Sequence, residues 1–427
     1  MKLCLTVMLS ALLTNAVLSL PVNALDIKAE LEPQQVLTIY QSVDELGKWV
    51  TFKSDLKLVQ IINKLHANLQ VGNRETAKAL FSAVQSQDID QVKTLLNQGV
   101  NPRFADNFGY TPLLIAAEKN NLEIVKLLLE KKANPNDMMP ALGTTPLLWA
   151  TYHNNEELAL LLLEKGADPN PKGKAPDSPL FLAAYKNNLK LVRTLLDKGA
   201  LVNQRNTGGD SALMAAVAHK NLELSLALIE KGADLNLKND NTFTALSIAA
   251  YNGNLEMVKF LVSKGADPDI VDQEGKFPLM WAVHSGHLEI VKFFQSQDLD
   301  LFKKSNDGSN LLMIAASQGQ NAMCTYLLSQ GFKPNEQSSD GATALMKAAY
   351  NGHLETLQTL LNAGAKVNMR KQDGSTALIW AVKNKQVNAA KFLLKNKADA
   401  SIKDTSGKRA VDYARASKNN DLMNLFK

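Results

Sequence analysis

Few residues of this chain are placed to do chemistry together. His284 and His287 are close enough in sequence to raise the question of a metal site. No paired-cysteine spacing accompanies them, and the chain has neither a glycine-rich phosphate loop nor a Gly-x-Ser-x-Gly nucleophile elbow. The sequence therefore predicts no catalytic residues, no bound metal and no cofactor.

The two cysteines also offer little chemistry. Cys4 lies in an apolar stretch at the start of the chain that is typical of a targeting segment, so the processed chain would hold one thiol and no internal disulfide. Cys324 falls at a core position of a predicted helix, where a cysteine acts as a small buried hydrophobe. An oxidising compartment is permitted by this usage but not required.

The elements that carry these residues form a repeat, which is clearest from Asn239 to Asp267. Thr244 is expected to cap a short apolar helix, because its hydroxyl can accept a hydrogen bond from a free amide of the first turn. Gly253 can adopt the left-handed conformation that ends a helix, and Gly265 can end a second, amphipathic helix in the same way. Neither helix can bury its apolar face alone, so each unit must stack on the next.

The unit returns with a constant period, except for one slightly longer step from Thr111 to Thr145. Its opening residues are Thr111, Thr145, Ser178, Ser211, Thr244, Phe277, Asn310, Thr343 and Thr376, with degenerate copies at Lys78 and Arg409. His287 lies in a turn that His353 repeats two units later. A Gly-Ala-Asp turn places aspartates at the recurring positions Asp168, Asp234, Asp267 and Asp399. The period alone thus explains these histidines and aspartates.

This pattern resembles the ankyrin repeat, in which Thr-Pro-Leu opens the first helix and Gly-Ala-Asp closes the second. The resemblance covers about 350 of the 427 residues. It implies an all-α fold, an ankyrin-repeat solenoid of helix-turn-helix-hairpin units of about 33 residues each, with a short helical N-terminal extension. It also implies that the first helices line a concave groove to which other proteins bind.

Composition narrows the class of partner. The formal net charge of +5 is small for 427 residues and is spread along the chain. Binding to nucleic acid needs a concentrated basic face, so a nucleic-acid partner is not expected. Charges predicted at the hairpin tips are mixed in sign rather than basic throughout, which favours a shaped protein or peptide partner; they are Asp177, Asp210, Asp240, Lys276, Asp307 and Asp373.

Residues 1–24 are typical of a secretory signal peptide. Lys2 precedes an uncharged apolar stretch, and small residues before Leu25 offer a cleavage site after Ala24. An uncleaved membrane anchor is the alternative. Cleavage predicts an exported product, periplasmic or secreted, that has no membrane span, and we expect it to be a monomer.

The rest of the chain divides into two predicted parts. Residues 25–76 do not follow the repeat and are expected to form a helical segment that caps the end of the solenoid or serves as a separate docking element. Residues 77–427 form the solenoid, about 11 units including the degenerate end caps. One hairpin, Asn136 to Thr144, is longer than its peers and apolar, so it is either a contact finger or folds back on its neighbour.

The candidate binding surface follows from the repeat. Counting each opening residue as zero, positions four, seven and eight share one face of the first helix, and we call these positions the inner stripe. Aromatic residues are concentrated there, and aromatic side chains are the usual energetic anchors of interfaces. The predicted partner-binding residues are Trp149, Tyr152, His153, Tyr185, Lys186, Tyr251, Asn252, Trp281, His284, Lys347, Tyr350, Trp380 and Lys383. Position four can also pack between repeats, so its tryptophans are alternatively scaffold.

Three functions are compatible with this sequence. The favoured hypothesis is an exported scaffold that binds another protein in the groove and catalyses nothing. The second is a secreted effector that scaffolds a host protein. The third is a glycan-binding protein whose aromatic residues stack on sugars.

Overall fold

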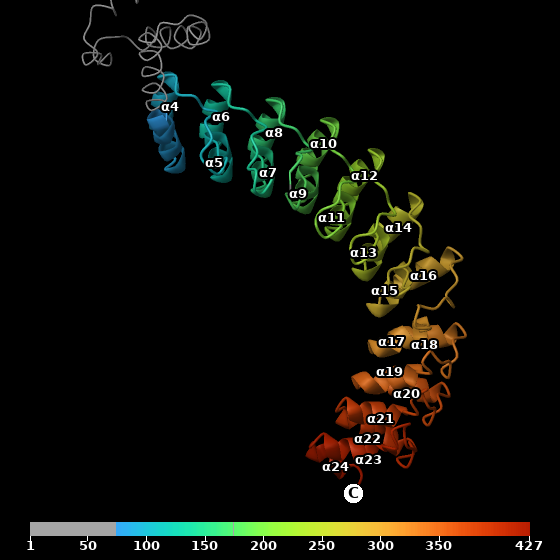
Figure 1. Ribbon diagram of the computed structural model, residues 1–427. Coiled ribbons are helices and arrows are strands. Elements are labelled where there is room, and N and C mark those ends of the chain that lie inside the picture. Colours follow the sequence, from blue (N-terminus) through green and yellow to red (C-terminus); the bar gives the residue numbers. More distant parts are fainter. Residues whose placement is uncertain (1–73, 174) are drawn as a thin grey trace, which may run out of the picture. The chain divides into compact units, whose positions relative to one another are not determined.

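The computed structural model describes residues 74–173 and 175–427 (Figure 1). Within these residues the chain consists of paired helices joined by turns and hairpins, and the only β pairing is an isolated bridge between Arg205 and Ser211. The predicted signal peptide, 1–24, and nearly all of the predicted capping segment, 25–76, lie outside the described residues. Both stay predictions.

The chain divides into two compact units, one ending at Ala175 and the other running from Pro176 to Lys427. In the first unit, residues 74–85 are helical. The helices that follow are α4 (Ile89–Asn97), α5 (Pro112–Glu118), α6 (Leu122–Glu130), α7 (Pro146–Tyr152) and α8 (Glu156–Glu164). The unit boundary falls within a regular step of the repeat, from Thr145 to Ser178.

The second unit continues the alternation of a short first helix and a longer second helix, except in its last pair, where the second helix is the shorter one. The first helices are α9 (Pro179–Tyr185), α11 (Ala212–Ala218), α13 (Ala245–Tyr251), α15 (Pro278–His284), α17 (Leu311–Ser317), α19 (Ala344–Asn351), α21 (Ala377–Lys383) and α23 (Ala410–Ala416). The second helices are α10 (Leu189–Asp197), α12 (Leu222–Glu230), α14 (Leu255–Ser263), α16 (Leu288–Ser296), α18 (Asn321–Ser329), α20 (Leu354–Asn362), α22 (Val387–Lys395) and α24 (Asn420–Asn424).

The first helices begin where the sequence predicts. Thr244 has an extended backbone and its hydroxyl accepts a hydrogen bond from the amide of Ser247, at 3.2 Å. The opening residues of α5, α7, α9, α11, α17, α19 and α21 make the same bond. Phe277 and Arg409 are exceptions, because neither has a side-chain oxygen. Phe277 opens α15 uncapped and its ring is buried instead, while at the start of α23 the Asp412 carboxylate accepts a hydrogen bond from the backbone amide of Arg409, at 2.8 Å.

The turns that end the helices also match the prediction. Gly253 follows α13 with φ of +71°, in the left-handed region, and Asn187 holds the equivalent place after α9 with φ of +57°. After α14, Asp267 accepts a hydrogen bond from the amide of Asp269 at 2.8 Å. Asp168, Asp234 and Asp399 make the same turn, which confirms their structural role.

Each helix pair buries one continuous core with its neighbours. In α13 and α14 the buried side chains include Leu246, Met257 and Leu261, each 0% exposed. Cys324 of α18 is a free, fully buried thiol, as predicted, and burial raises its pKa to about 12. A buried thiol that stays protonated is a poor nucleophile at neutral pH.

Part of the apolar hairpin of the first unit folds back on its neighbour, which is one of the two predicted alternatives; a role as a contact finger stays a prediction. Met139 is buried, and the ring of Pro140 fills the space where a side chain on Gly109 would stand. This part folds back on the preceding hairpin. Leu142 is 57% exposed and Met138 is 38% exposed, so the rest of the hairpin faces outward.

The second unit, taken by itself, places its two kinds of helix on opposite sides. From α9 to α18 the first helices lie along the inner side of its curve and the second helices along the outer side (Figure 1). The inner stripe therefore belongs to one continuous face of this unit.

Candidate functional site

The tyrosines of the inner stripe are exposed. They occupy position seven, and their exposed fractions are 56% for Tyr185, 47% for Tyr251 and 45% for Tyr350 in the second unit, and 55% for Tyr152 in the first. The caps and apolar faces of the first helices are buried, which fixes the rotation of each helix and turns position seven outward. An exposed phenol on a fixed helix is well suited to be a contact anchor.

The tryptophans at position four are only half-exposed, because neighbouring side chains cover them. Trp281 donates from Nε1 to Asp272 at 3.1 Å, and Lys276 Nζ lies 4.8 Å from its ring centroid. Phe243 packs on the same indole with ring centroids 4.8 Å apart, and Tyr251 meets it edge-on at 5.9 Å. Trp281 thus supports the exposed Tyr251 from below.

The same support recurs elsewhere on the stripe. Trp380 lies edge-on to Tyr350 at 5.6 Å, with Lys371 Nζ 5.7 Å from its ring centroid. Trp149 lies edge-on to Tyr152 at 5.9 Å and stacks on His153 at 6.0 Å. Tyr152, Tyr251 and Tyr350 are thus each paired with a half-buried tryptophan, whereas Tyr185 stacks on the buried Phe181 at 6.1 Å.

Side chains at position eight form hydrogen bonds to the preceding repeat. The sequence did not indicate these bonds. His153 Nε2 lies 2.8 Å from the carbonyl oxygen of Glu118, and His219 Nε2 lies 2.6 Å from that of Tyr185. Asn351 and Asn384 donate to the carbonyls of the preceding first helices in the same way, at 2.9 and 2.6 Å. A carbonyl can only accept, so the histidine nitrogens must carry the proton. His153 therefore has a structural role in addition to any contact with a partner.

The remaining predicted residues lie on the same face. Lys186, Asn252 and Lys383 are exposed, while His284 is half-buried. Burial, together with the nearby charge of Lys276, lowers the pKa of His284 below its usual value. The surroundings of His284 thus favour the uncharged form of its imidazole.

Lys347 lines two hollows in the inner face of the second unit, together with Ser317 and Gln318. One hollow, of about 400 Å³, includes Lys276, His284, Asp307, Ile314, Gln318 and Lys347 in its lining. The other, of about 630 Å³, is lined by Ser317, Gln318, Lys347, Tyr350, Asn351, His353 and Trp380. Each is large enough to receive one or two side chains of a partner.

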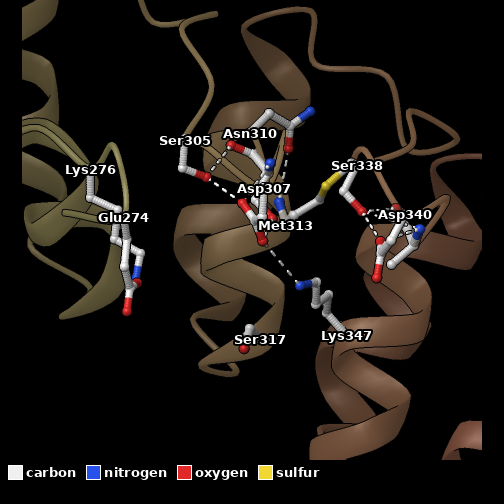
Figure 2. A network of polar contacts seen from close by, with 12 residues as sticks. Glu274, Lys276, Ser305, Asp307, Asn310, Met313, Ser317, Ser338, Asp340 and Lys347 are labelled. Atoms are coloured by element: carbon white, nitrogen blue, oxygen red, sulfur yellow. Dashed lines mark hydrogen bonds and ion pairs between the residues drawn. The ribbon is translucent and has the colours of Figure 1, made fainter. Parts of the chain in front are cut away.

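A polar network borders these hollows (Figure 2). Asp307 accepts hydrogen bonds from the hydroxyls of Ser305 and Ser309, at 2.6 and 2.8 Å, and Lys347 points toward it from α19. Partial burial raises the pKa of Asp307, but these hydrogen bonds and the charge of Lys347 outweigh it and hold the pKa below its usual value. In the next hairpin Asp340 is bound by Ser338 and by Lys371.

Comparison with known proteins shows that the helices carrying this surface match a repeat family. The family model described as ankyrin repeats (three copies) matches residues 80–173, 172–239, 226–307, 246–338 and 312–404, which together span 80–404. That is more than half of the 427 residues. The chain belongs to the ankyrin repeat family. Ankyrin repeats generally mediate protein–protein interaction, and ankyrin proteins are generally non-catalytic scaffolds.

Individual ankyrin proteins match only short stretches. "Ankyrin repeat, SAM and basic leucine zipper domain-containing protein 1" of Carollia perspicillata is 37% identical over 62 residues, 14% of this chain and 13% of that protein. A putative ankyrin repeat protein of Rickettsia felis is 45% identical over 42 residues, 10% of this chain and 16% of its own length. A putative ankyrin repeat protein of fowlpox virus is 34% identical over 65 residues, 15% of this chain and 46% of its own. The matches thus cover well under two thirds of each relative.

The ankyrin array continues the inner stripe further than the sequence analysis followed it. Tyr413 is position four of the last unit, one period after Trp380, and this spacing was the available signal. Its hydroxyl donates to the buried Asp404 at 2.5 Å, and Lys383 Nζ lies 4.4 Å from its ring centroid. Burial raises the pKa of Asp404, but bonds from Ser406 and Tyr413 hold it well below the usual range. This cluster joins α21 to the hairpin and the first helix of the next unit.

Among residues 74–173 and 175–427 no three His, Cys, Asp or Glu side chains come together as a group able to hold a metal ion. In the same part of the chain none of the helices has the length and apolar character needed to cross a bilayer.

Proposed function

We propose that this ankyrin protein is an exported, non-catalytic scaffold that binds a partner protein along the inner face of its second unit. Tyr185, Tyr251 and Tyr350 act as anchors, and the side chains around Lys347 add polar contacts. The observation that carries the proposal is the exposure of these tyrosines on rigid, capped helices, since aromatic side chains held in place lose little entropy on binding.

The covered ring faces of the tryptophans argue against a glycan that stacks on them as the main ligand. A sugar ring needs an open aromatic face, whereas Trp281 has Lys276 and Phe243 packed close to its indole. Tyrosines remain accessible, but they are spread over helices α9, α13 and α19 rather than forming a continuous ladder. A shaped protein surface fits separate anchors better than a glycan chain does.

The test is co-precipitation from the native cell envelope, comparing wild type with the double variant Tyr251→Ala/Tyr350→Ala. We expect a discrete protein to be retained by the wild type and lost from the variant, with the two chains equally folded by circular dichroism. Equal retention by both chains would refute the role of the tyrosines. A double substitution on the outer helices, Lys259→Ala/Lys391→Ala, is the matched control.

Export rests on the residues of the leader and is tested separately. Cell fractionation and amino-terminal sequencing should find the mature chain beginning at Leu25, outside the cytoplasm. A product confined to the periplasm would count against an effector delivered to a host, and a cytoplasmic chain that retains Met1 would contradict export altogether.

A further inference from the structure

Lys347 is a charged residue where the repeat accommodates apolar ones. It occupies position four of α19, on the inner stripe, and its side chain is only 26% exposed. In the other first helices of the second unit this position holds Leu182, Ala215, Ile248, Trp281, Ile314, Trp380 and Tyr413. Drawing an ammonium group partly out of water costs free energy that an apolar residue would not cost. The stacking of repeats therefore does not explain this lysine.

The ammonium group of Lys347 makes only one long ion pair within the described residues. Its Nζ lies 3.8 Å from Asp307 Oδ2, which is too far for an N–H···O hydrogen bond. Asp307 is already bound by Ser305 and Ser309, and within the described residues we find no other acidic group in ion-pair contact with Lys347. By contrast, Lys371 Nζ lies 3.0 Å from Asp340. Lys347 thus keeps hydrogen-bonding capacity for a group from outside.

The residues around Lys347 favour an acidic side chain as the group that binds it. The hollow of about 630 Å³ beside it contains Tyr350, Trp380, Gln318 and Asn351 and no acidic residue in its lining. Every inner-stripe position from α9 to α21 is likewise free of Asp and Glu. A carboxylate entering here meets the ammonium group of Lys347 and the side-chain amide of Gln318, because the amide of Asn351 already donates to the carbonyl of Ser317. A neighbouring apolar side chain meets the exposed ring of Tyr350, one helical turn from Lys347.

We propose that Lys347 is the counter-ion for an aspartate or glutamate side chain of the partner protein, seated in the hollow formed with Tyr350 and Trp380. The partner segment carries an apolar or aromatic residue next to that acid, which packs on Tyr350. This inference rests on the proposed function, because it names the partner chemistry recognised by the same face.

The experiment uses random peptides displayed on phage and selected against the full chain. Selected peptides should be enriched in Asp or Glu beside an apolar residue. Fluorescence anisotropy of a selected peptide should show that Lys347→Met weakens binding about tenfold or more. Met should be accommodated, since position four is apolar in the neighbouring repeats. Lys391→Met removes the same charge from an exposed site on α22, outside the groove, and should leave the affinity unchanged.

A double-mutant cycle identifies the contact itself. Replacing the peptide's Glu by Gln should weaken binding to wild type as strongly as Lys347→Met does, and should have no further effect on the Lys347→Met chain. Additive losses, or selected peptides without acidic residues, would overturn the inference.

Variants of Tyr350 and Lys347 distinguish the groove from the counter-ion. If peptides bind and respond to Tyr350→Ala but not to Lys347→Met, the role of Lys347 is wrong while the tyrosine-anchored groove stands. If no selected peptide responds to either Tyr350→Ala or Tyr251→Ala, the proposed function itself is wrong for this face, and the inference falls with it.

Discussion

The imidazole of His287 lies over Gly253 of the preceding repeat. Ring atoms of His287 stand 2.4 to 2.8 Å from the point that a Cβ on Gly253 would occupy, and Nε2 lies 2.9 Å from the carbonyl oxygen of Tyr251. The same arrangement joins His353 to Gly319. A glycine at the end of a first helix and a histidine at the start of the second helix of the following repeat therefore form one contact between repeats. This contact also holds the end of α13, the helix that presents Tyr251.

Gly253→Ala should destabilise the chain by more than the cost of placing an alanine in the left-handed backbone conformation. A non-glycine residue in the left-handed region costs about 1 to 2 kcal/mol, and the new Cβ would also displace His287. Gly265→Ala is the matched control, because Gly265 also has a positive φ but has open space around it. In urea denaturation, the free energy of unfolding of the Gly253→Ala chain should be lower than that of the Gly265→Ala chain. In a His287→Ala background the difference should shrink, and an unchanged difference would contradict the contact.

Tyr251→Ala should cost little stability compared with a core substitution in the same helix. Tyr251 is 47% exposed, whereas Leu246 is fully buried. Leu246→Ala should cost about 2 to 5 kcal/mol, and Tyr251→Ala about 1 kcal/mol, mostly from its edge contact with Trp281. Equal losses in the free energy of unfolding would show that Tyr251 is scaffold rather than a surface anchor.

Trp281→Ala should behave as a structural substitution. Because the indole is half-buried and is contacted by Asp272, Lys276 and Phe243, its removal should cost about 2 to 4 kcal/mol. Trp281→Phe keeps most of the packing and loses only the bond to Asp272, so it should cost less. A Trp281→Ala chain as stable as wild type, measured by thermal and urea unfolding, would contradict this role.

The sequence predicted the fold closely because the repeat depends on local chemistry. Caps such as Thr244, turn residues such as Gly253 and core residues such as Leu246 each act within a few residues, and the period of the array repeats them. The division at Ala175 and Pro176 had no such signal, because the spacing of the opening residues does not change there.

The candidate site was only partly predictable, since its details depend on contacts between repeats. Position seven could be placed outward from helix geometry, and Tyr185, Tyr251 and Tyr350 are exposed accordingly. The bond from His153 to a carbonyl of the preceding repeat could not be read from spacing alone. Nor could the cover over Trp281, because Phe243 and Lys276 reach it from hairpins rather than from its own helix.

Acid should weaken the hairpin that contains Asp340. Partial burial raises the pKa of Asp340, but hydrogen bonds from Ser338, Lys371 and the amide of Ala342 outweigh it and lower the pKa from 3.8 to about 2. A carboxylate whose pKa is depressed on folding stabilises the folded chain above its unfolded pKa, and this contribution is lost as the pH falls from about 3.8 to about 2.

In the Asp340→Asn chain, the urea midpoint should therefore fall less steeply between pH 3.8 and about 2 than it does in wild type. Above that range the variant should be less stable than wild type. Because the side chain is half-exposed, the effect should be modest and should shrink with added salt. Superimposable acid profiles for wild type and Asp340→Asn would show that the Asp340 network contributes nothing to folding.

The central claim is that the inner face of the second unit contacts a partner protein through its exposed tyrosines. Site-specific photo-crosslinking in the native cell tests it most directly, with a photoreactive phenylalanine analogue at Tyr251 and, as the matched position, at the exposed Glu256 of the outer helix α14. The account predicts a discrete crosslinked protein band from position 251 and none from position 256. No band from position 251, or the same band from both positions, would contradict it.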